Sequence, residues 1–164
     1  MDEEGREKLV RELLGGTGET LWLEAPIHFA YGCHTTVGDH FYSNFNLTVV
    51  DDGRVSIGNS VMFGPNVTIS TTGHPVHPYY RMRGAHFSLP VVIEDGVWIG
   101  ANVVVMPGVT IGKNSVIGAG SVVTRDIPEN VVAFGTPCRV IRPITDADLE
   151  TIRPGMTINA DWNT

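Results

Sequence analysis

The chain has 164 residues, enough for one domain with its own core, and it holds 19 glycines but only 18% charged residues. Its net charge of −7 offers no basic surface, so we expect neither nucleic acid nor a membrane as a partner. Cys33 and Cys138 fit neither a disulfide framework nor a paired-cysteine metal site. They indicate two free thiols in a cytoplasmic protein.

The N-terminal segment, residues 1–22, contains EGREKLVRELL immediately before Gly15 and Gly16. This spacing of apolar and charged residues predicts a short amphipathic helix. The acidic, charged beginning is unlike a signal peptide, and no apolar run in the chain approaches the roughly 18 residues of a membrane span. We therefore expect a cytoplasmic location.

The middle of the chain, residues 23–142, repeats every six residues. The repeating positions are mostly aliphatic and fall in two phases, separated by an insertion around Asp51: Tyr31, Val37, Ser43 and Val49, then Ile57, Phe63, Ile69, Ile93, Ile99, Val105, Ile111, Ile117 and Val123. Neither an α-helix nor a simple strand has this period. A short strand followed by a corner does, and three such units close a triangular coil of 18 residues. Thirteen hexads predict an all-β solenoid of slightly more than four coils.

Two further positions of the hexad support this interpretation. Residues that tolerate a left-handed backbone lie three after the aliphatic one: Asn66, Gly96, Asn102, Gly108, Asn114 and Gly120. Small or β-branched residues lie four after it: Val67, Val97, Val103, Val109, Ser115 and Ser121. The first set predicts the corners of the coil, and the second leaves room beside the aliphatic side chain.

The repeat is interrupted by residues 71–90, between Ile69 and Ile93. Ile93 lies 24 residues after Ile69 and not six, and the 18 extra residues equal one coil, but in that register Arg81 would point into the apolar core, at a prohibitive cost. We therefore expect an extruded loop, and loops of this length are usually functional or disordered. Three histidines and two tyrosines are not a disordered composition.

The C-terminal segment, residues 143–164, begins with a capping-box pattern over Thr145–Asp148. This pattern predicts a brief helix. We expect residues 154–164 to form a loose tail.

Four sequence blocks are more specific than the repeat itself: FYSNFNLTVVDD, TGHPVHP, GVWIGANVVVMPGVTIG, and NSVIGAGSVVTRDIPENVV followed by GTPCRVIR. Through them, residues from about 24 to 148 resemble the hexapeptide-repeat sugar O-acetyltransferases, which include the galactoside and maltose enzymes. The resemblance implies a left-handed parallel β-helix, an exception to the right-handed crossover rule. It also implies transfer of an acetyl group from acetyl-CoA to a sugar hydroxyl, without a metal.

The resemblance also implies the roles of individual residues. His74, in TGHP, would be the general base, which suits an imidazole because it ionises near neutral pH. Acceptor-binding positions would be Ala30, Tyr42, Asn44, Asp52 and His86. Positions binding acetyl-CoA would be Trp98, Ala101, Ala119, Thr124, Arg125, Arg139 and Arg142, with the arginines holding phosphates. The expected assembly is a homotrimer with its sites between subunits.

Three departures from the family pattern bear on the acceptor. Ala30 replaces a serine of the galactoside enzyme, and His86 replaces a methionine. Most of the family's N-terminal helical segment, which carries an acidic acceptor-binding residue, is expected to be missing, because the chain begins partway through it.

Other interpretations stay open on sequence alone. The acceptor could be another hydroxyl or an amine, on serine, an amino sugar or a xenobiotic, or the chain could be a non-catalytic β-helix scaffold. A zinc hydrolyase of the γ-carbonic anhydrase type shares the fold and would use histidines, here drawn from His34, His40, His74, His77 and His86. Asn44 could be a turn residue and Asp52 a solvated insert. Trp98 could pack in an interface, and the arginines could be solvated surface charge.

Overall fold

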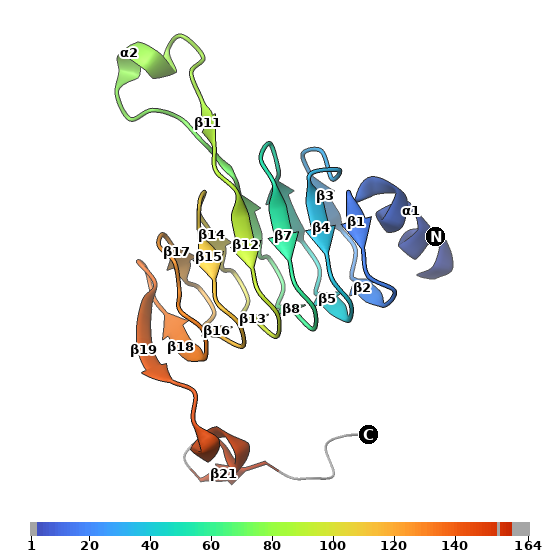
Figure 1. The fold of residues 1–164 in the computed structure, drawn as a ribbon, viewed down its shortest axis with the longest axis vertical. Helices are drawn as coiled ribbons and strands as arrows, with labels where there is room; N and C mark the ends of the chain where they lie inside the picture. The colour runs from blue at the N-terminus through green and yellow to red at the C-terminus, as the bar shows by residue number, and fades with distance from the viewer. Residues whose placement is uncertain (1–2, 154, 159–164) are drawn as a thin grey trace.

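The computed structural model describes residues 3–153 and 155–158 and shows a parallel β-helix built from three sheets (Figure 1). Sheet A consists of β1 (Gly16–Thr17), β4 (Thr35–Val37), β7 (Val55–Ile57), β12 (Val91–Ile93) and β15 (Thr110–Ile111). Sheet B consists of β2 (Leu21–Leu23), β5 (Phe41–Ser43), β8 (Met62–Phe63), β13 (Trp98–Ile99), β16 (Val116–Ile117), β18 (Val131–Phe134) and β19 (Arg139–Pro143). Sheet C consists of β3 (Ile27–Phe29), β6 (Leu47–Val50), β9 (Thr68–Ser70), β14 (Val104–Val105) and β17 (Val122–Val123).

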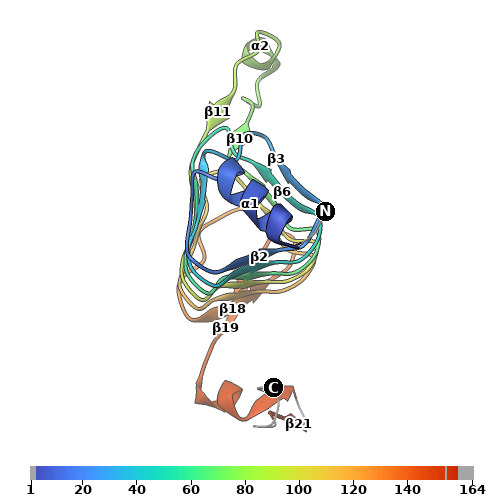
Figure 2. The same cartoon turned by 90° about the vertical axis from the view of Figure 1, so that its right-hand side faces the viewer.

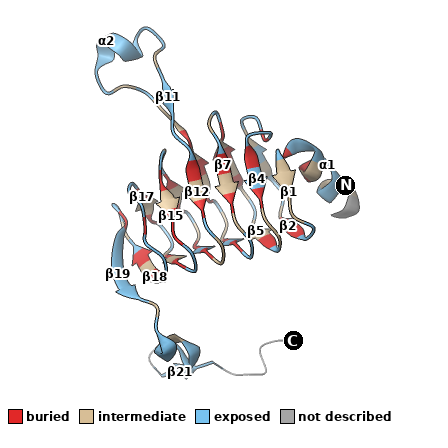
Figure 3. Cartoon of the chain, in the orientation of Figure 1, coloured by how far each residue is buried: buried red, intermediate tan, exposed pale blue. Residues whose placement is uncertain are grey.

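The predicted aliphatic positions stack inside the coil. Ile57, Ile93 and Ile111 are parallel partners in sheet A, and all three are buried. The small residues four positions later, such as Val97 and Ser115, are also fully buried, so each hexad contributes two inward side chains. Figure 3 shows these buried residues along the coil. The prediction of a stacked aliphatic core is confirmed.

The corners also follow the sequence. All six predicted corner residues have positive φ, between 57° at Asn102 and 83° at Gly108. The side-chain amide of Asn46 donates to Asn66 at 2.9 Å, and that of Asn66 donates to Asn102 at 3.1 Å. The asparagines therefore form a ladder of hydrogen bonds along the corner between sheets B and C.

The number of coils differs from the prediction. Sheets A and C each hold five strands, because the first coil begins at Gly16, ahead of residue 23. Tyr31, expected in the inward series, is 55% exposed. The physical reason lies beneath it: the buried carboxylate of Asp51 accepts hydrogen bonds from the amides of Tyr31 and Gly32 and from the Thr35 hydroxyl. These bonds hold residues 30–34 as a tight loop outside the repeat.

Residues 71–90 project from the coil as expected. The loop leaves from the edge where strands of sheet C lead into sheet A, which we call the C–A corner. At its neck β10 (Thr72–Gly73) pairs antiparallel with β11 (Phe87–Ser88), and its tip carries α2 (Pro78–Arg81). Arg81 is exposed and donates to the carbonyl of Val76 at 2.9 Å, so its charge stays outside the core.

Both ends of the solenoid carry additional structure. The helix α1 (Glu3–Leu13) lies across the N-terminal end of the coil, as Figure 2 shows, and buries Val10. At the C-terminal end, η1 (Asp146–Leu149) has the predicted capping box. The predicted loose tail is wrong in part, because β21 (Met156–Thr157) pairs with β20 (Thr151–Arg153); residues 154 and 159–164 lie outside the described residues.

Cys33 and Cys138 are free thiols, the first exposed and the second buried, and burial raises the pKa of the Cys138 thiol. Among the helices described, none has the length and apolar character that a membrane crossing requires.

Candidate active site

His74 lies at the neck of the extruded loop, directly after β10. Its Nδ1 is 2.9 Å from the carbonyl oxygen of Ala85. Because a carbonyl oxygen only accepts, Nδ1 carries the proton and the ring is held in one tautomer. The lone pair of Nε2 is then free, on an exposed ring. In the neutral imidazole this tautomer presents Nε2 as an acceptor, which is what a general base needs.

The backbone around His74 is fixed by close packing. A Cβ atom on Gly73 would lie 2.5 Å from Cζ of Phe87, so only glycine allows this approach of the ring. In the antiparallel pairing of β10 with β11, Gly73 lies opposite Phe87 and Thr72 lies opposite Ser88. Sequence reasoning identified His74 but missed Ala85 and Phe87, which orient it. In the sequence, the only indication of this role of Ala85 and Phe87 was their position in the loop, opposite the TGHP motif.

A cavity of about 490 Å³ lies on the C–A corner and the adjoining face of sheet A, and it contains the predicted acceptor residue Asp52. Its lining is polar and carries both signs of charge: Cys33, His34, Thr36, Asp52, Arg54 and Ser56. Nδ1 of His34 donates to the carbonyl of Asp51 at 2.7 Å, which leaves its Nε2 as an acceptor. Ala30 follows β3 on the same corner. Sequence reasoning missed Arg54 and considered His34 only as a zinc ligand.

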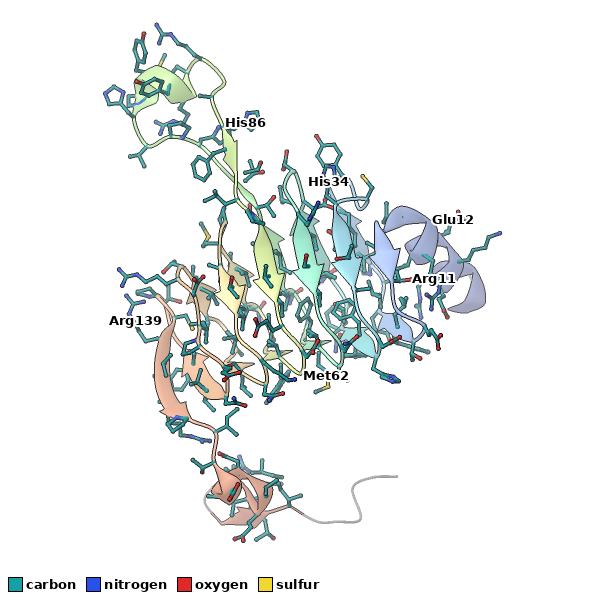
Figure 4. The ribbon with its side chains drawn as sticks, viewed as in Figure 1. Arg11, Glu12, His34, Met62, His86 and Arg139 are labelled. Carbon is teal, nitrogen blue, oxygen red and sulfur yellow. The ribbon has the colours of Figure 1, made fainter. Side chains whose placement is uncertain are left out.

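Tyr42 and Asn44 lie on a different part of the solenoid. Tyr42 is on sheet B, paired with Trp22 and Met62, and Asn44 follows it at the corner between sheets B and C. Figure 2 shows sheet B at the base of the triangular coil, opposite the apex from which the loop rises. In Figure 4, Met62 of sheet B likewise lies on the opposite side of the coil from His34 and His86. A single chain therefore does not bring Tyr42 and Asn44 to His74.

Asn44 and Trp98 also have structural neighbours within the chain. The side-chain oxygen of Asn44 accepts from the amide of Phe45 at 2.8 Å, so Asn44 also supports the corner, and its side-chain NH₂ remains available as a donor. Trp98 is 51% exposed on sheet B, beside Met62. It belongs to an outward row of large apolar side chains on this sheet.

Besides Trp98, the positions expected to bind acetyl-CoA fall into three groups. Ala101 and Ala119 are stacked at the corner between sheets B and C, where Gly120 donates to the carbonyl of Ala101 at 2.8 Å. Thr124 and Arg125 are exposed at the C–A corner. Arg139 and Arg142 are exposed on β19 at the C-terminal end of sheet B, and Figure 4 shows Arg139 at that end.

Arg142 is engaged by a carboxylate. Its two terminal nitrogens donate to Asp148 at 2.8 and 2.7 Å. This bidentate bond, with a further hydrogen bond from the amide of Thr145, lowers the pKa of Asp148 to about 2. The same contact raises the pKa of Arg142. Arg139, by contrast, makes only a local hydrogen bond to the carbonyl of Cys138 among the described residues.

The histidines considered as zinc ligands are spread over the coil and the extruded loop. His34 is at the C–A corner, His40 is at the corner between sheets A and B, and His74, His77 and His86 are on the loop. Within residues 3–153 and 155–158, no three His, Cys, Asp or Glu side chains are grouped closely enough to hold a metal ion.

The chain is similar in sequence and in fold to known proteins. Residues 90–125 match the bacterial transferase hexapeptide (six repeats) family. Galactoside O-acetyltransferase of Escherichia coli K12 is 57% identical over 145 residues, which cover 88% of this chain and 71% of that protein. The chain belongs to the hexapeptide-repeat acetyltransferase family. The Lactococcus lactis galactoside O-acetyltransferase is 52% identical, over 94% of this chain and 75% of that protein.

Solved structures of the family agree in fold. A galactoside acetyltransferase in complex with coenzyme A superposes with a TM-score of 0.89 at 50% identity, covering 96% of this chain and 78% of that chain. A maltose O-acetyltransferase from Clostridium difficile 630 gives 0.87 at 46% identity, over 88% and 77%. The expected left-handed parallel β-helix and membership of this acetyltransferase family are confirmed.

Proposed function

We propose that this acetyltransferase transfers an acetyl group from acetyl-CoA to a hydroxyl group of a sugar, with His74 as the general base. The observation that carries the proposal is the anchored imidazole: Nδ1 donates to the Ala85 carbonyl, and Nε2, on an exposed ring, has no hydrogen-bond partner among the described residues. Nε2 removes the proton of the sugar hydroxyl while its oxygen attacks the thioester carbonyl. The C–S bond then breaks, the acetyl group stays on the sugar, and the proton passes to the departing thiolate of CoA.

The acceptor side is suited to a ligand with many hydroxyl groups. Asp52, His34 and Arg54 present a carboxylate, an imidazole and a guanidinium to one cavity, and Thr36 and Ser56 add hydroxyl groups. Asp52 makes no ion pair with any described residue, so its carboxylate is available to accept hydrogen bonds from a sugar. Ala30 and His86 complete the acceptor set on this side of the molecule.

The complete site is proposed to lie between two copies of the chain in a homotrimer. His74 and Asp52 belong to the C–A corner, whereas Tyr42 and Asn44 belong to sheet B and its edge. A cyclic trimer places one surface of each copy against a different surface of the next. With the C–A corner of one copy against sheet B of its neighbour, Tyr42 and Asn44 would join the acceptor pocket. The exposed apolar row containing Trp22, Met62 and Trp98 would then be covered.

Acetyl-CoA is proposed to bind along the same junction. Ala101 and Ala119 would contribute backbone groups, and Trp98 an aromatic face. Thr124, Arg125, Arg139 and Arg142 would hold the phosphates, because guanidinium groups bind phosphate through paired hydrogen bonds. Brought together from two copies, these groups would give a chain of net charge −7 the local positive charge that an anionic nucleotide needs. Since acetyl-CoA is charged and does not cross membranes unaided, we place the reaction in the cytoplasm.

A direct test is an acetyl-CoA-dependent screen of glycosides, maltose, amino sugars and serine, with release of the CoA thiol as the readout. We expect glycosides to give the highest kcat/KM. Thiol release with serine or an amino sugar but with no glycoside would contradict the sugar hydroxyl as acceptor. Absence of transfer to every compound would contradict the enzymatic proposal.

A further inference from the structure

The cavity of about 490 Å³ at the C–A corner contains a guanidinium group that has no anionic partner in the described part of the chain. Arg54 lines this cavity and is exposed. Within residues 3–153 and 155–158, its side chain makes no ion pair and no hydrogen bond. Asp52 lines the same cavity, but its carboxylate does not pair with the guanidinium. Arg54 is therefore available to an anionic group of a ligand.

The stacking of the coils explains why Arg54 has no anionic neighbour across sheet A. β4 pairs with β7 in parallel, with Thr35 opposite Val55. One residue earlier in the same register, His34 lies beside Arg54. On the other side β12 pairs with β7, and the residue in the corresponding position is Pro90. The two neighbours of Arg54 across the sheet are thus an imidazole and a proline ring, and neither carries a negative charge.

The other polar groups of the cavity suit the hydroxyl groups of the same ligand. Nδ1 of His34 donates to the carbonyl of Asp51 at 2.7 Å, so the neutral ring presents Nε2 as an acceptor. The carboxylate of Asp52 only accepts hydrogen bonds. The cavity therefore offers one positively charged donor beside two strong acceptors, which matches a ligand that has one anionic group and several hydroxyl groups.

The charge of Asp52 also indicates which anion fits. A guanidinium binds a carboxylate through two parallel hydrogen bonds. A phosphate monoester carries up to two negative charges, so the nearby Asp52 carboxylate opposes it more than it opposes a singly charged carboxylate. The cavity is therefore better suited to a carboxylate than to a phosphate.

The turn that carries Arg54 packs against the neck of the extruded loop. The amide of Gly53 donates to the hydroxyl of Thr71 at 2.9 Å. A Cβ atom on Gly53 would lie 3.2 Å from Cβ of Ser88, which belongs to β11 at the neck. His74 follows β10, the other strand of the neck. The cavity and the proposed base thus belong to the same region of the chain.

We propose that Arg54 is a specificity-determining residue that selects sugar acceptors carrying a carboxylate. The guanidinium binds the carboxylate, while Asp52 and Nε2 of His34 accept hydrogen bonds from hydroxyl groups of the same acceptor. This inference rests on the proposed function and narrows its substrate class from sugars to acidic sugars and glycosides of acids. A neutral sugar leaves the guanidinium to water.

The experiment uses two pairs of acceptors, each an acid and its uncharged amide: para-carboxyphenyl galactoside with para-carbamoylphenyl galactoside, and methyl glucuronide with methyl glucuronamide. The members of a pair have the same ring hydroxyl groups and differ in charge. In the wild type we expect kcat/KM for the acid to exceed that for its amide by about two- to fivefold in at least one pair, the scale of an exposed ion pair. High ionic strength should reduce this preference, because salt screens exposed charges.

Two substitutions of Arg54 test its role. Arg54→Gln should bring the ratio of acid to amide close to one, and should do so by lowering kcat/KM for the acid alone. Arg54→Lys keeps the charge but not the paired hydrogen bonds, so it should retain part of the preference. A para-phosphonophenyl galactoside tests the kind of anion. We expect it to be a poorer acceptor than the carboxylate, and a higher kcat/KM would overturn the carboxylate as the selected group.

Arg83→Gln is the matched control, because it removes the same charge from a residue that does not line the cavity. Its guanidinium lies 3.8 Å from the centre of the Tyr79 ring, on the extruded loop. Equal kcat/KM for acid and amide in both pairs of the wild type overturns the inference and leaves the proposed function standing. An unchanged ratio in folded Arg54→Gln, or the same loss in Arg83→Gln, also overturns the role of Arg54. If no compound is acetylated, the proposed function fails, and the inference fails with it.

Discussion

Arg142 and Asp148 form a bidentate ion pair, with N–O distances of 2.8 and 2.7 Å. The carboxylate also accepts from the amide of Thr145 at 2.9 Å, so one aspartate both caps η1 and holds β19. Arg142 was expected from the sequence to bind a phosphate of acetyl-CoA. In this structure its guanidinium already has an anionic partner, and a phosphate must compete with Asp148 for it.

The ion pair predicts how the C-terminal segment responds to acid. The hydrogen bond from Arg142 lowers the pKa of Asp148 to about 2, below the usual value of about 3.9 for an aspartate. A group with a lowered pKa stabilises the fold above its unfolded value, and that contribution is lost as the pH falls through the folded value. We expect Asp148 to remain ionised at pH 3, as seen in an NMR titration of its carboxyl carbon. Arg142→Gln should move the midpoint up towards the ordinary range. A wild-type midpoint near 4 would contradict the pairing.

Arg139 and Arg142 on β19 should affect the binding of acetyl-CoA and not the binding of the acceptor. Replacing Arg139 and Arg142 together by Ala should raise KM for acetyl-CoA and leave KM for the acceptor nearly unchanged, because phosphates lie far from the reacting carbonyl. Asp148→Asn frees Arg142 and should lower KM for acetyl-CoA by about two- to fivefold, the scale of an exposed ion pair. Steady-state kinetics with each substrate varied will show this. A change in the KM for the acceptor would contradict the assignment.

The shared site predicts a trimer of about 53 kDa, three times the 17.8 kDa of one chain. The reason is that Tyr42 and His74 lie on surfaces of one chain that do not meet. Sedimentation equilibrium measures the mass, and activity measured across the same concentrations shows whether the assembly is required. A stable monomer with full activity would rule out a site between subunits.

The close stacking of coils predicts a strong response at Gly100. A Cβ atom there would lie 2.7 Å from the backbone nitrogen of Ala119, in the next coil. Gly100→Ala should therefore destabilise the fold by about 1–3 kcal/mol, the cost of overpacking. Gly16→Ala is the control, because its Cβ would lie 3.6 Å from the side chain of Thr36. Thermal unfolding should distinguish the two, and equal melting temperatures would contradict the packing described.

Much of the fold could be predicted because the hexad restricts every position. Asn66 and Gly96 must take a left-handed backbone, and Ile93 must point inward, so a periodic sequence specifies a periodic coil. Tyr31 was misplaced because the buried Asp51 carboxylate organises its loop, and this depends on contacts that no six-residue period encodes.

The site was less predictable than the coil. His74 could be identified from its motif, but its anchor at Ala85 depends on how a non-repetitive loop folds back on itself. The pairing of Arg142 with Asp148 depends on where η1 lies after the solenoid ends. The grouping of residues from two copies follows from the geometry of the coil, which places Tyr42 and His74 on different sides.

The central claim is that His74 is the general base, and it is tested most directly by kcat of His74→Ala. A positioned acid–base group contributes about 10²–10⁴-fold, so we expect kcat to fall by that factor while the affinity for acetyl-CoA barely changes. In the wild type, kcat/KM should rise with pH as the base loses its proton, and this pH dependence should be missing from the residual rate of the variant. A histidine that only supports the loop would lower thermal stability, and activity would fall only in proportion to the unfolded fraction. A well-folded His74→Ala enzyme that keeps more than about a tenth of the wild-type kcat would contradict the assignment of His74 as the base.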